Sequence, residues 1–222
     1  MTRPLAAVLG RGVEPAEHDH VLGDPAAPVT VLEYGDYECP YCAAAAPVLR
    51  RLVEESEGGV RLVFRNFPLA DKHPYALTAA LAAEAAGAQG AFWPMHEMIF
   101  ARQDRLDDVS LRSYADELGL APGRVVGGPA QPFGDKVEAD FAAGLEAGVG
   151  GTPTVFIDGR LYSGRVEAGA LRRAIGNGSD PDGGRDPRPG RQRRWSLGIR
   201  RAQRETLPED PEQDDPGDRC NY

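Results

Sequence analysis

The chain has 222 residues, of which 41% are hydrophobic, and it is long enough to bury a core in one large domain or two small ones. Its formal net charge of -9 argues against a nucleic-acid partner. No apolar run approaches the length of a membrane span, and the short apolar stretch at residues 5–9 falls short of a secretory signal. We therefore expect a cytoplasmic protein without a membrane span, held where thiols are mostly reduced.

The first part of the chain predicts a strand, a helix and a second strand. We expect residues 1–24 to be a flexible polar leader. The β-branched run at residues 29–34 then predicts a buried strand, and the helix after it begins at Cys39 and Cys42. Residues 60–66 alternate into a second strand, which the helical connection makes parallel to the first. The two cysteines should therefore lie at the carboxyl edge of a sheet.

The middle of the chain shows helical spacing and no convincing strand. Four helices are predicted, at residues 75–88, 91–103, 110–118 and 133–147. Strand character returns at residues 154–157, an Asp-Gly pair makes a hairpin turn, residues 161–163 pair back, and a helix closes the sheet at residues 166–175. Residues 74–148 therefore form an all-helical insertion.

The last part of the chain, residues 177–222, is rich in Gly, Pro and charge. An arginine-rich stretch at residues 185–204 is followed by an acidic stretch at residues 205–218. Such a composition cannot bury enough apolar surface to fold, so we predict a disordered tail. Cys220, near its end, is interpreted as an incidental terminal thiol.

The spacing of Cys39 and Cys42 predicts a redox pair. A thiol must ionise to attack a disulfide, and a cysteine at a helix start is helped by unpaired N–H groups and the helix dipole. Cys39 is therefore assigned as the nucleophile, and Cys42, one turn later and more buried, as the resolving thiol. Half of a zinc site has the same spacing, but zinc takes about four ligands, and the sequence has no second CxxC or Cys-His pair. We expect no metal.

A proline before the third strand is the next candidate. Pro153 cannot continue a strand ladder, and a cis Thr152-Pro153 bond would press its loop against the Cys39 sulfur. The backbone groups of Thr152 would then pair with an extended substrate. An ordinary trans turn proline is the alternative, and it is the commoner conformation when the residues are considered alone.

Glu33 interrupts the first apolar strand, six residues before Cys39. It should point toward the core if Val31 does not. Burial would then raise the pKa of its carboxyl, and we interpret Glu33 as a proton shuttle for Cys42. The alternative is that Glu33 faces solvent on the other side of the strand.

Several motifs, in this order, resemble the DsbA-like thioredoxin-fold family. They lie at residues 20–25, 29–42, 62–68, 92–96 and 150–159. The resemblance covers about residues 18–175 and implies an α/β thioredoxin fold with a mixed central sheet. In such a fold, residues 25–73 and 149–176 form the thioredoxin-fold domain, and residues 74–148 are the inserted helical subdomain.

The resemblance also implies roles for single residues. Cys39 matches the family's nucleophile, Cys42 its resolving cysteine, Glu33 its buried acid, Pro153 its cis-proline and Pro47 its helix kink. The resemblance therefore makes the cis form the expected conformation of Pro153.

The dipeptide between the cysteines departs from the family's periplasmic oxidants, which usually carry Pro-His. Pro40-Tyr41 is similar to the glutaredoxin dipeptide instead. Tyr41 brings no positive charge and Glu38 adds a negative one, so we expect a higher Cys39 pKa and a milder oxidant than those relatives. Together with Thr152, Pro40 and Tyr41 are the expected substrate contacts.

The leading interpretation is a thiol-disulfide oxidoreductase that exchanges disulfides with protein or peptide substrates and with a redox partner. It needs no cofactor beyond its two thiols, and glutathione or a thioredoxin system is the candidate reductant. Two alternatives stay open. One is a glutathione-dependent transferase or isomerase of the same fold, for which the resemblance implies a serine in place of the CxxC. The other is a non-catalytic peptide-binding or holdase module.

Overall fold

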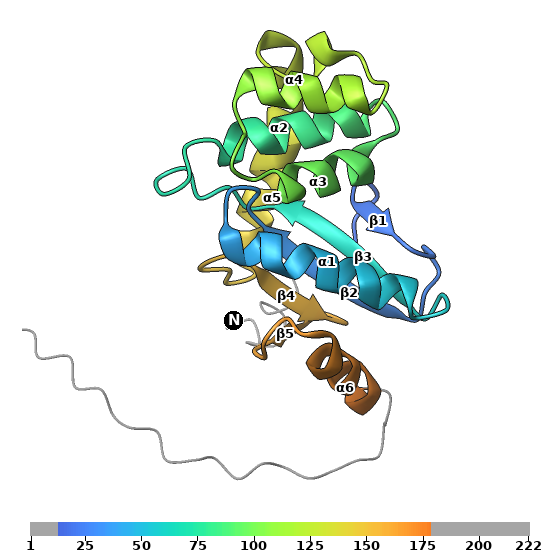
Figure 1. Ribbon diagram of the computed structural model, residues 1–222. Helices are drawn as coiled ribbons and strands as arrows, with labels where there is room; N and C mark the ends of the chain where they lie inside the picture. The colour runs from blue at the N-terminus through green and yellow to red at the C-terminus, as the bar shows by residue number, and fades with distance from the viewer. Residues whose placement is uncertain (1–12, 179–222) are drawn as a thin grey trace, which may run out of the picture. The chain divides into compact units, whose positions relative to one another are not determined.

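A mixed sheet forms the centre of the computed structural model, which describes residues 13–178 (Figure 1). In the described residues the sheet has five strands in the order β1-β3-β2-β4-β5. The strands are β1 (His20–Leu22), β2 (Val29–Gly35), β3 (Val60–Asn66), β4 (Thr154–Ile157) and β5 (Arg160–Tyr162). Strands β2 and β3 are parallel, and the other neighbours pair antiparallel. The predicted tail falls almost entirely on residues 179–222, which lie outside the described residues, as do residues 1–12.

The predicted strand-helix-strand unit is present, with α1 (Pro40–Glu54) connecting β2 to β3. Apolar side chains at helical spacing along α1, among them Leu49 and Leu52, pack with Val31 and Leu62 of the strands. The closing helix α6 (Ala168–Gly178) adds Leu171 to the same cluster. This cluster holds α1 against the sheet, because removing such side chains from water is the main source of stability.

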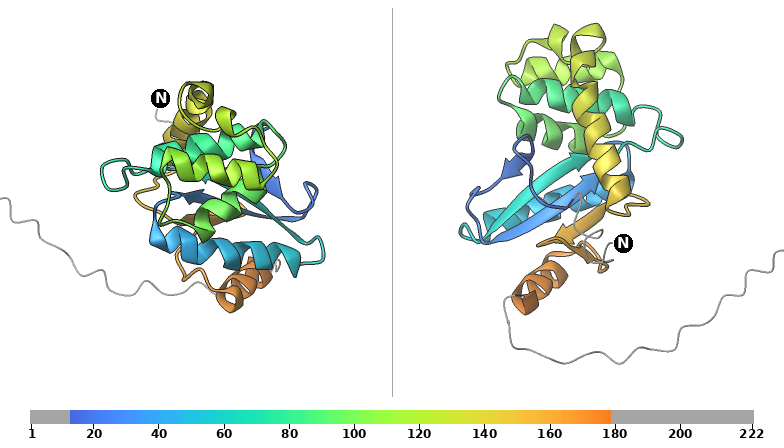
Figure 2. Two further views of the ribbon diagram at one scale, coloured as in Figure 1. Left: turned by 45° about the horizontal axis from the view of Figure 1, so that its top comes forward. Right: turned by 180° about the vertical axis from the view of Figure 1, so that it is seen from behind.

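The opposite face of the sheet is covered as well. Helix α5 (Gly134–Glu146) lies on the side away from α1 (Figure 2), and its Phe141 ring stacks on Phe67 with 4.4 Å between the ring centroids. A Cβ on Gly144 would come within 2.6 Å of the Phe67 ring, so glycine permits this close approach. Central strand β2 is consequently buried on both faces from residue 31 to residue 35.

The residues between β3 and β4 are helical, as predicted. They form α2 (Ala76–Gly87), α3 (Phe92–Ala101), α4 (Asp108–Glu117) and α5, and each predicted helix agrees with the observed one to within two residues at either end. Two short 3-10 helices, η2 (Pro122–Arg124) and η3 (Gly128–Phe133), were not predicted. Helix α2 is mostly alanine and buried on nearly all sides, which allows its neighbours to approach closely. The predicted fold class is confirmed.

The prediction of a flexible leader is wrong for residues 13–24. Val13 is buried, residues 20–22 form the edge strand β1 on β3, and the Asp19 carboxylate pairs with the Arg65 guanidinium at 2.7 Å. Both of these charged side chains are at most 5% exposed. The partners lie more than forty residues apart in the sequence, so composition near residue 19 gave no sign of them.

No helix within residues 13–178 is both long and apolar enough to cross a membrane. The cytoplasmic location stays a prediction.

The Asp19–Arg65 pair generates a stability prediction. We expect Asp19→Ala to lower the free energy of unfolding by about 3 kcal/mol, because the variant leaves a buried guanidinium without its carboxylate. Urea unfolding followed by circular dichroism measures the change. The exposed neighbour Glu17 supplies the control, and Glu17→Ala should cost under about 0.5 kcal/mol. Equal losses in the two variants would show that the leader contributes nothing specific.

Candidate active site

Cys39 caps the N-terminus of α1 at the carboxyl edge of the parallel strand pair. Its backbone is extended, with φ -77° and ψ 121°, and Pro40 occupies the first helical turn, where a missing N–H costs nothing. Cys42 follows one turn later and is fully buried, whereas Cys39 keeps 4% of its surface exposed. Both are free thiols. The structure therefore places the pair where the sequence predicted it.

The two thiols have opposite acidities. The pKa of Cys39 is lowered to about 5, first by the hydrogen bond from the Cys42 thiol and against the effect of burial, with further help from Thr152 and the N–H groups of Cys42 and Tyr41. Burial raises the pKa of Cys42 far above its ordinary value, and its hydrogen bond to Cys39 adds to this shift. At neutral pH the pair therefore holds one thiolate, at Cys39, and one proton, on Cys42.

Glu33 is fully buried, and neither of its carboxyl oxygens has a hydrogen-bond partner. Burial, the larger cause, and the negative charge of Cys39 together raise its pKa to about 8. The expectation that Val31 and Glu33 point to opposite sides is wrong, because residues two apart on a strand share a face. Both are buried since each face of β2 is covered. The solvent-facing alternative is thereby excluded.

The loop before β4 lies against the nucleophile. The Thr152–Pro153 peptide bond is cis, and the Cys39 sulfur lies 3.3 Å from the Thr152 carbonyl oxygen, to which it donates when it is protonated. The Thr152 hydroxyl is buried and bonded to no other group, and the Thr152 side chain is one of those that lower the Cys39 pKa. Of the other expected substrate contacts, Pro40 is exposed and Tyr41 is 74% exposed, on the first turn of α1. Thr152 therefore lies beside the Cys39 sulfur, Pro40 and Tyr41 follow Cys39 in the chain with exposed side chains, and the substrate-binding roles of all three remain predictions.

Asp36 is a site residue that the sequence reasoning missed. Its buried carboxylate accepts hydrogen bonds from the N–H groups of Glu38 and Leu69 and lies 2.8 Å from Nδ1 of His73. Its own N–H donates to the Cys42 sulfur at 3.4 Å. The bond to Glu38 is an Asx-turn, which an aspartate after glycine and before a helix start could have indicated. Asp36 therefore fixes the turn that leads into Cys39.

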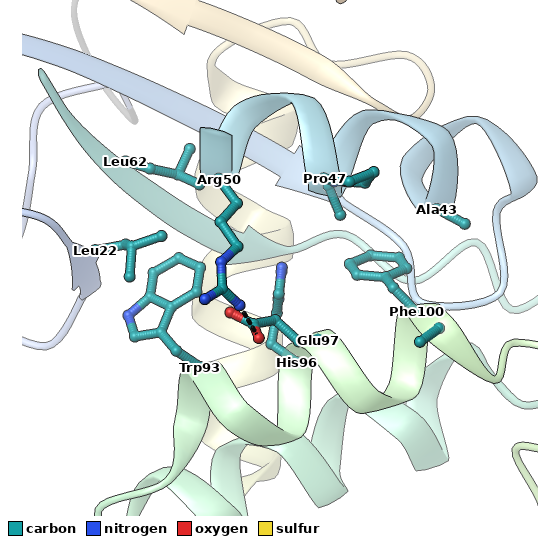
Figure 3. Close-up of a pocket in the computed structure, with 11 residues that line it drawn as sticks. Leu22, Ala43, Pro47, Arg50, Leu62, Trp93, His96, Glu97 and Phe100 are labelled. Atoms are coloured by element: carbon teal, nitrogen blue, oxygen red, sulfur yellow. Dashed lines mark ion pairs between the residues drawn. The ribbon is translucent and has the colours of Figure 1, made fainter. Parts of the chain in front are cut away.

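A pocket of about 260 Å³ lies between α1 and α3 (Figure 3). Its lining is mostly apolar, with Pro47 and Trp93 on facing helices, and the Arg50–Glu97 ion pair crosses it. Neither cysteine lines this pocket. Among residues 13–178, no three His, Cys, Asp or Glu side chains gather in a way that would hold a metal ion.

Comparison with known sequences finds one family model, described as Thioredoxin, that matches residues 15–177. Curated relatives include the Na(+)/H(+) antiporter NhaA 3 of Salinispora tropica, 44% identical over 177 residues, which are 77% of this chain and 27% of the relative. The Na(+)/H(+) antiporter NhaA 1 of Salinispora arenicola is 45% identical over 160 residues, 72% and 24% of the two chains. This chain matches about a quarter of the length of these relatives.

Solved structures share the fold. BdbD from Bacillus subtilis superposes with a TM-score of 0.66 at 24% identity, over 75% of this chain and 96% of that one. The thiol-disulfide exchange protein alpha-DsbA2 from Wolbachia pipientis gives 0.65 at 20% identity, over 73% and 88%. A thioredoxin-like oxidoreductase from Silicibacter pomeroyi gives 0.64 at 29% identity, over 73% and 93%. These matches confirm the DsbA-like thioredoxin fold that the motifs predicted.

The buried carboxyl of Glu33 makes stability depend on pH. In the unfolded chain its pKa is the ordinary 4.5, and in the folded protein it is about 8. Between these values the folded state keeps a proton that the unfolded state has released. The contribution of Glu33 to the free energy of unfolding is therefore complete below pH 4.5 and falls by about 1.4 kcal/mol per pH unit up to about pH 8.

We expect Glu33→Gln, which cannot ionise, to lack this fall. Cys39 acts in the opposite direction over much of the same range, because its pKa is lowered from 9.0 to about 5. The quantity to measure is therefore the difference in unfolding free energy between reduced wild type and reduced variant, by urea titration from pH 5 to pH 8. A difference that stays constant with pH contradicts a buried, proton-holding Glu33.

Proposed function

The chain belongs to the thioredoxin family, and from that premise we propose that it is a thiol-disulfide oxidoreductase with Cys39 and Cys42 as its redox pair. The observation that carries the proposal is the position of two thiols at the start of α1, with the Cys39 sulfur 3.3 Å from the Thr152 carbonyl oxygen of the cis-proline loop and Cys42 buried one turn later. The opposite shifts of the two thiol pKa values agree with it. A thiolate beside a protonated thiol, 4% and 0% exposed, suits attack by the first and resolution by the second.

In the proposed cycle, the Cys39 thiolate attacks one sulfur of a substrate disulfide. A Cys39–substrate bond forms, the substrate S–S bond breaks, and the first substrate sulfur leaves as a thiolate. Cys42 then loses its proton and attacks the Cys39 sulfur. The second substrate thiolate leaves, two electrons have passed to the substrate, and the Cys39–Cys42 disulfide remains. The reverse steps oxidise a substrate dithiol, and the redox partner sets the direction.

Glu33 is proposed as the base that takes the Cys42 proton, directly or through a water. Its carboxyl is buried without a partner, and its charge is among the groups that raise the pKa of Cys42, so the two groups interact. A carboxyl with a pKa near neutrality is suited to proton transfer, since it is both available to ionise and basic enough to accept a proton. Glu33 thus has an acidity matched to the resolving step.

Substrates are proposed to be protein or peptide thiols and disulfides. The Thr152 carbonyl already lies at hydrogen-bond distance from the nucleophile, and it would accept an N–H from an extended substrate segment as the sulfurs react. The exposed Pro40 and Tyr41, next to Cys39 in the chain, would offer apolar contact to the same segment. No cofactor beyond the two thiols is needed, and glutathione or a thioredoxin system would serve as reductant.

The acidity of Cys39 supports a milder oxidant than the strongest of this fold. Its pKa of about 5 lies above the value near 3.5 of the most oxidising enzyme of this kind. A less stable thiolate makes the reduced form less favoured, and the disulfide correspondingly less oxidising. The Glu38 carboxylate, whose negative charge was expected to raise the Cys39 pKa, accepts a hydrogen bond from the Tyr75 N–H at 2.6 Å.

The two alternatives make different demands on the site. A glutathione-dependent transferase or isomerase needs one activated group and has no use for Cys42, whose sulfur is held by Cys39 and by the Asp36 N–H. A holdase needs neither thiol. The proposed exchange is the reading that uses both thiols and the buried carboxyl together.

The names of the curated relatives favour one particular partner. Antiporters that contain a stretch 44% identical to this chain suggest that a thioredoxin-fold unit of this type works beside a cation/proton antiporter. We propose a membrane transporter, with thiols accessible from water, as a candidate substrate or neighbour of this chain.

Exchange activity tests the assignment of the nucleophile. We expect Cys39→Ser to abolish the acceleration of insulin reduction by dithiothreitol or a glutathione couple, because the variant lacks the sulfur that forms the mixed disulfide. The matched control is Cys220→Ser, which removes the other cysteine outside the pair and should keep wild-type turnover. A Cys39→Ser variant as active as wild type would sink the proposal. A transferase would keep its turnover in Cys42→Ala, and a holdase would keep its binding in Cys39→Ser.

Cys42→Ala identifies the partners in the same series, because without the resolving thiol the Cys39 mixed disulfide persists. Incubated with separated membrane and soluble fractions of cells, the variant should carry disulfide-linked proteins that dithiothreitol releases. A linked antiporter in the membrane fraction supports the transporter partner, and adducts confined to the soluble fraction contradict it. Cys39→Ala/Cys42→Ala is the control that should trap nothing.

The role of Glu33 is tested by the resolving step alone. We expect a labelled peptide to leave its mixed disulfide with Cys39 about a hundredfold more slowly in Glu33→Gln than in wild type at neutral pH. The wild-type rate should rise with pH up to a midpoint no higher than about 8, and the variant should lack this rise. Glu54→Gln, an exposed carboxylate on α1, is the control. An unchanged pH profile in Glu33→Gln would remove the proposed role.

A further inference from the structure

One face of α3 points at the turn that carries the nucleophile. His96 and Phe100 lie four residues apart, on one side of α3, and Gln103 lies in the turn that follows the end of this helix at Ala101. Figure 3 shows the His96 and Phe100 side chains rising from α3 toward α1. The Tyr37 hydroxyl lies 3.0 Å from Nδ1 of His96, and the Tyr37 and Phe100 rings are 4.9 Å apart.

Gln103 contacts the backbone of the nucleophile. Its Nε2 amide donates to the carbonyl oxygens of Tyr37 and Cys39, each at 2.8 Å. Carbonyl oxygens only accept hydrogen bonds, so the nitrogen, and not the oxygen, of the Gln103 carboxamide must face them. Both amide hydrogens are thus used, one on each side of Glu38.

We propose that Gln103 is a positioning residue of the redox centre, which holds the Cys39 turn in the conformation that stabilises the thiolate. The inference rests on the proposed function for its importance in catalysis, and on the two hydrogen bonds of Gln103 for its geometry. Neither the CxxC motif nor the cis-proline loop contains this residue.

The physical link runs through the backbone of the helix start. The Cys39 carbonyl accepts from the N–H groups of Cys42 and Ala43, which begins the helix, and from Gln103 as well. Holding this carbonyl fixes the peptide planes of the first turn, and the N–H groups of Tyr41 and Cys42 in that turn are among those that stabilise the Cys39 thiolate. The partial positive charge of the Gln103 amide lies beside the same turn and acts in the same direction.

A purely structural role of Gln103 would give a different experimental result. Gln103 could simply fasten the helical insertion to the sheet, in which case its loss would lower the melting temperature without changing the acidity of Cys39. The proposed positioning role changes the pKa of Cys39. The two are separated by measuring both quantities in the same variants.

The test uses the full chain with Cys220→Ser, so that Cys39 is the reactive thiol. The principal variant is Gln103→Met, which keeps the length of the side chain and removes its N–H groups. Gln103→Ala is the second variant, should methionine pack poorly. Gln89→Met is the matched control, because Gln89 also makes two hydrogen bonds within the helical insertion, to Ala85 and Ala121.

The rate of iodoacetamide modification of the reduced protein is followed by mass spectrometry from pH 4 to pH 8. We expect both Gln103 variants to shift the midpoint of this profile upward and to slow modification at pH 4.5 about threefold or more, as the thiolate fraction falls. Gln89→Met should keep the wild-type midpoint, whatever its melting temperature. A wild-type midpoint in the Gln103 variants overturns the inference.

Failure of the proposed function would be visible separately. The alkylation profile needs no substrate, so it reports on Gln103 even in a protein that does not reduce insulin. A wild-type protein that does not accelerate insulin reduction would refute the oxidoreductase function. An alkylation profile that is unshifted in the Gln103 variants, while wild type is active, would refute the positioning role alone.

Discussion

A nearly buried negative charge is the constraint on which this site depends. Cys39 exposes 4% of its surface, so its thiolate cannot rely on water and must be stabilised by donors that the fold supplies. The main donor is the Cys42 thiol, and the N–H groups of the first turn and Thr152 add to it. Thr152 is 113 residues away in the sequence. Pairing of β2 with β4, antiparallel from residue 31 to residue 34, brings its loop to the start of α1.

The same constraint determines how Glu33 behaves. A second negative charge in a buried site is unfavourable, and the Cys39 thiolate is one of the two causes that raise the Glu33 pKa. The ionisation of the two groups is therefore linked. In the proposed cycle, the mixed disulfide removes the charge of Cys39, and Glu33 then ionises more readily, at the stage when Cys42 has a proton to lose. Glu33 therefore becomes able to accept the Cys42 proton at the stage when the Cys39 sulfur is bound in the mixed disulfide.

Much of this arrangement was readable from the sequence, because its signals are local. The β-branched run before the cysteines, the alternation after the first helix and the helical spacing in the insertion placed the predicted strands and the four helices of the insertion to within two residues. The first helix ends about four residues before its glycine pair, and the closing helix ends three residues beyond its prediction. The missed features have distant partners. Edge strand β1 depends on Arg65 and β3, and Gln103 binds backbone carbonyls more than sixty residues earlier. Every residue has a backbone carbonyl, so a contact to this group leaves no sequence motif that could predict it.

The face of Glu33 was misjudged for a different reason. Alternation along β2 places Val31 and Glu33 together, and the error lay in assuming that one face of the strand meets water. Helix α5, which comes about a hundred residues later, covers the second face with Phe141. A strand in a parallel pair is commonly buried on both sides, so a lone acid within it has no exposed side to occupy. Its burial follows from topology and not from the strand's own pattern.

The helical insertion is part of the active site and not an addition to it. The domain boundary expected from the sequence, between residues 73 and 74, separates His73 from Tyr75. Both residues nevertheless contact the turn before Cys39. His73 lies 2.8 Å from the Asp36 carboxylate, and the Tyr75 N–H donates to the Glu38 carboxylate. The turn after α3 binds the same segment through Gln103. Movement of the insertion would therefore act directly on the turn that orients the nucleophile. The thioredoxin-fold part supplies the cysteines, the cis-proline and Asp36, and the insertion adds the contacts of Tyr75 and Gln103 that hold the turn before Cys39.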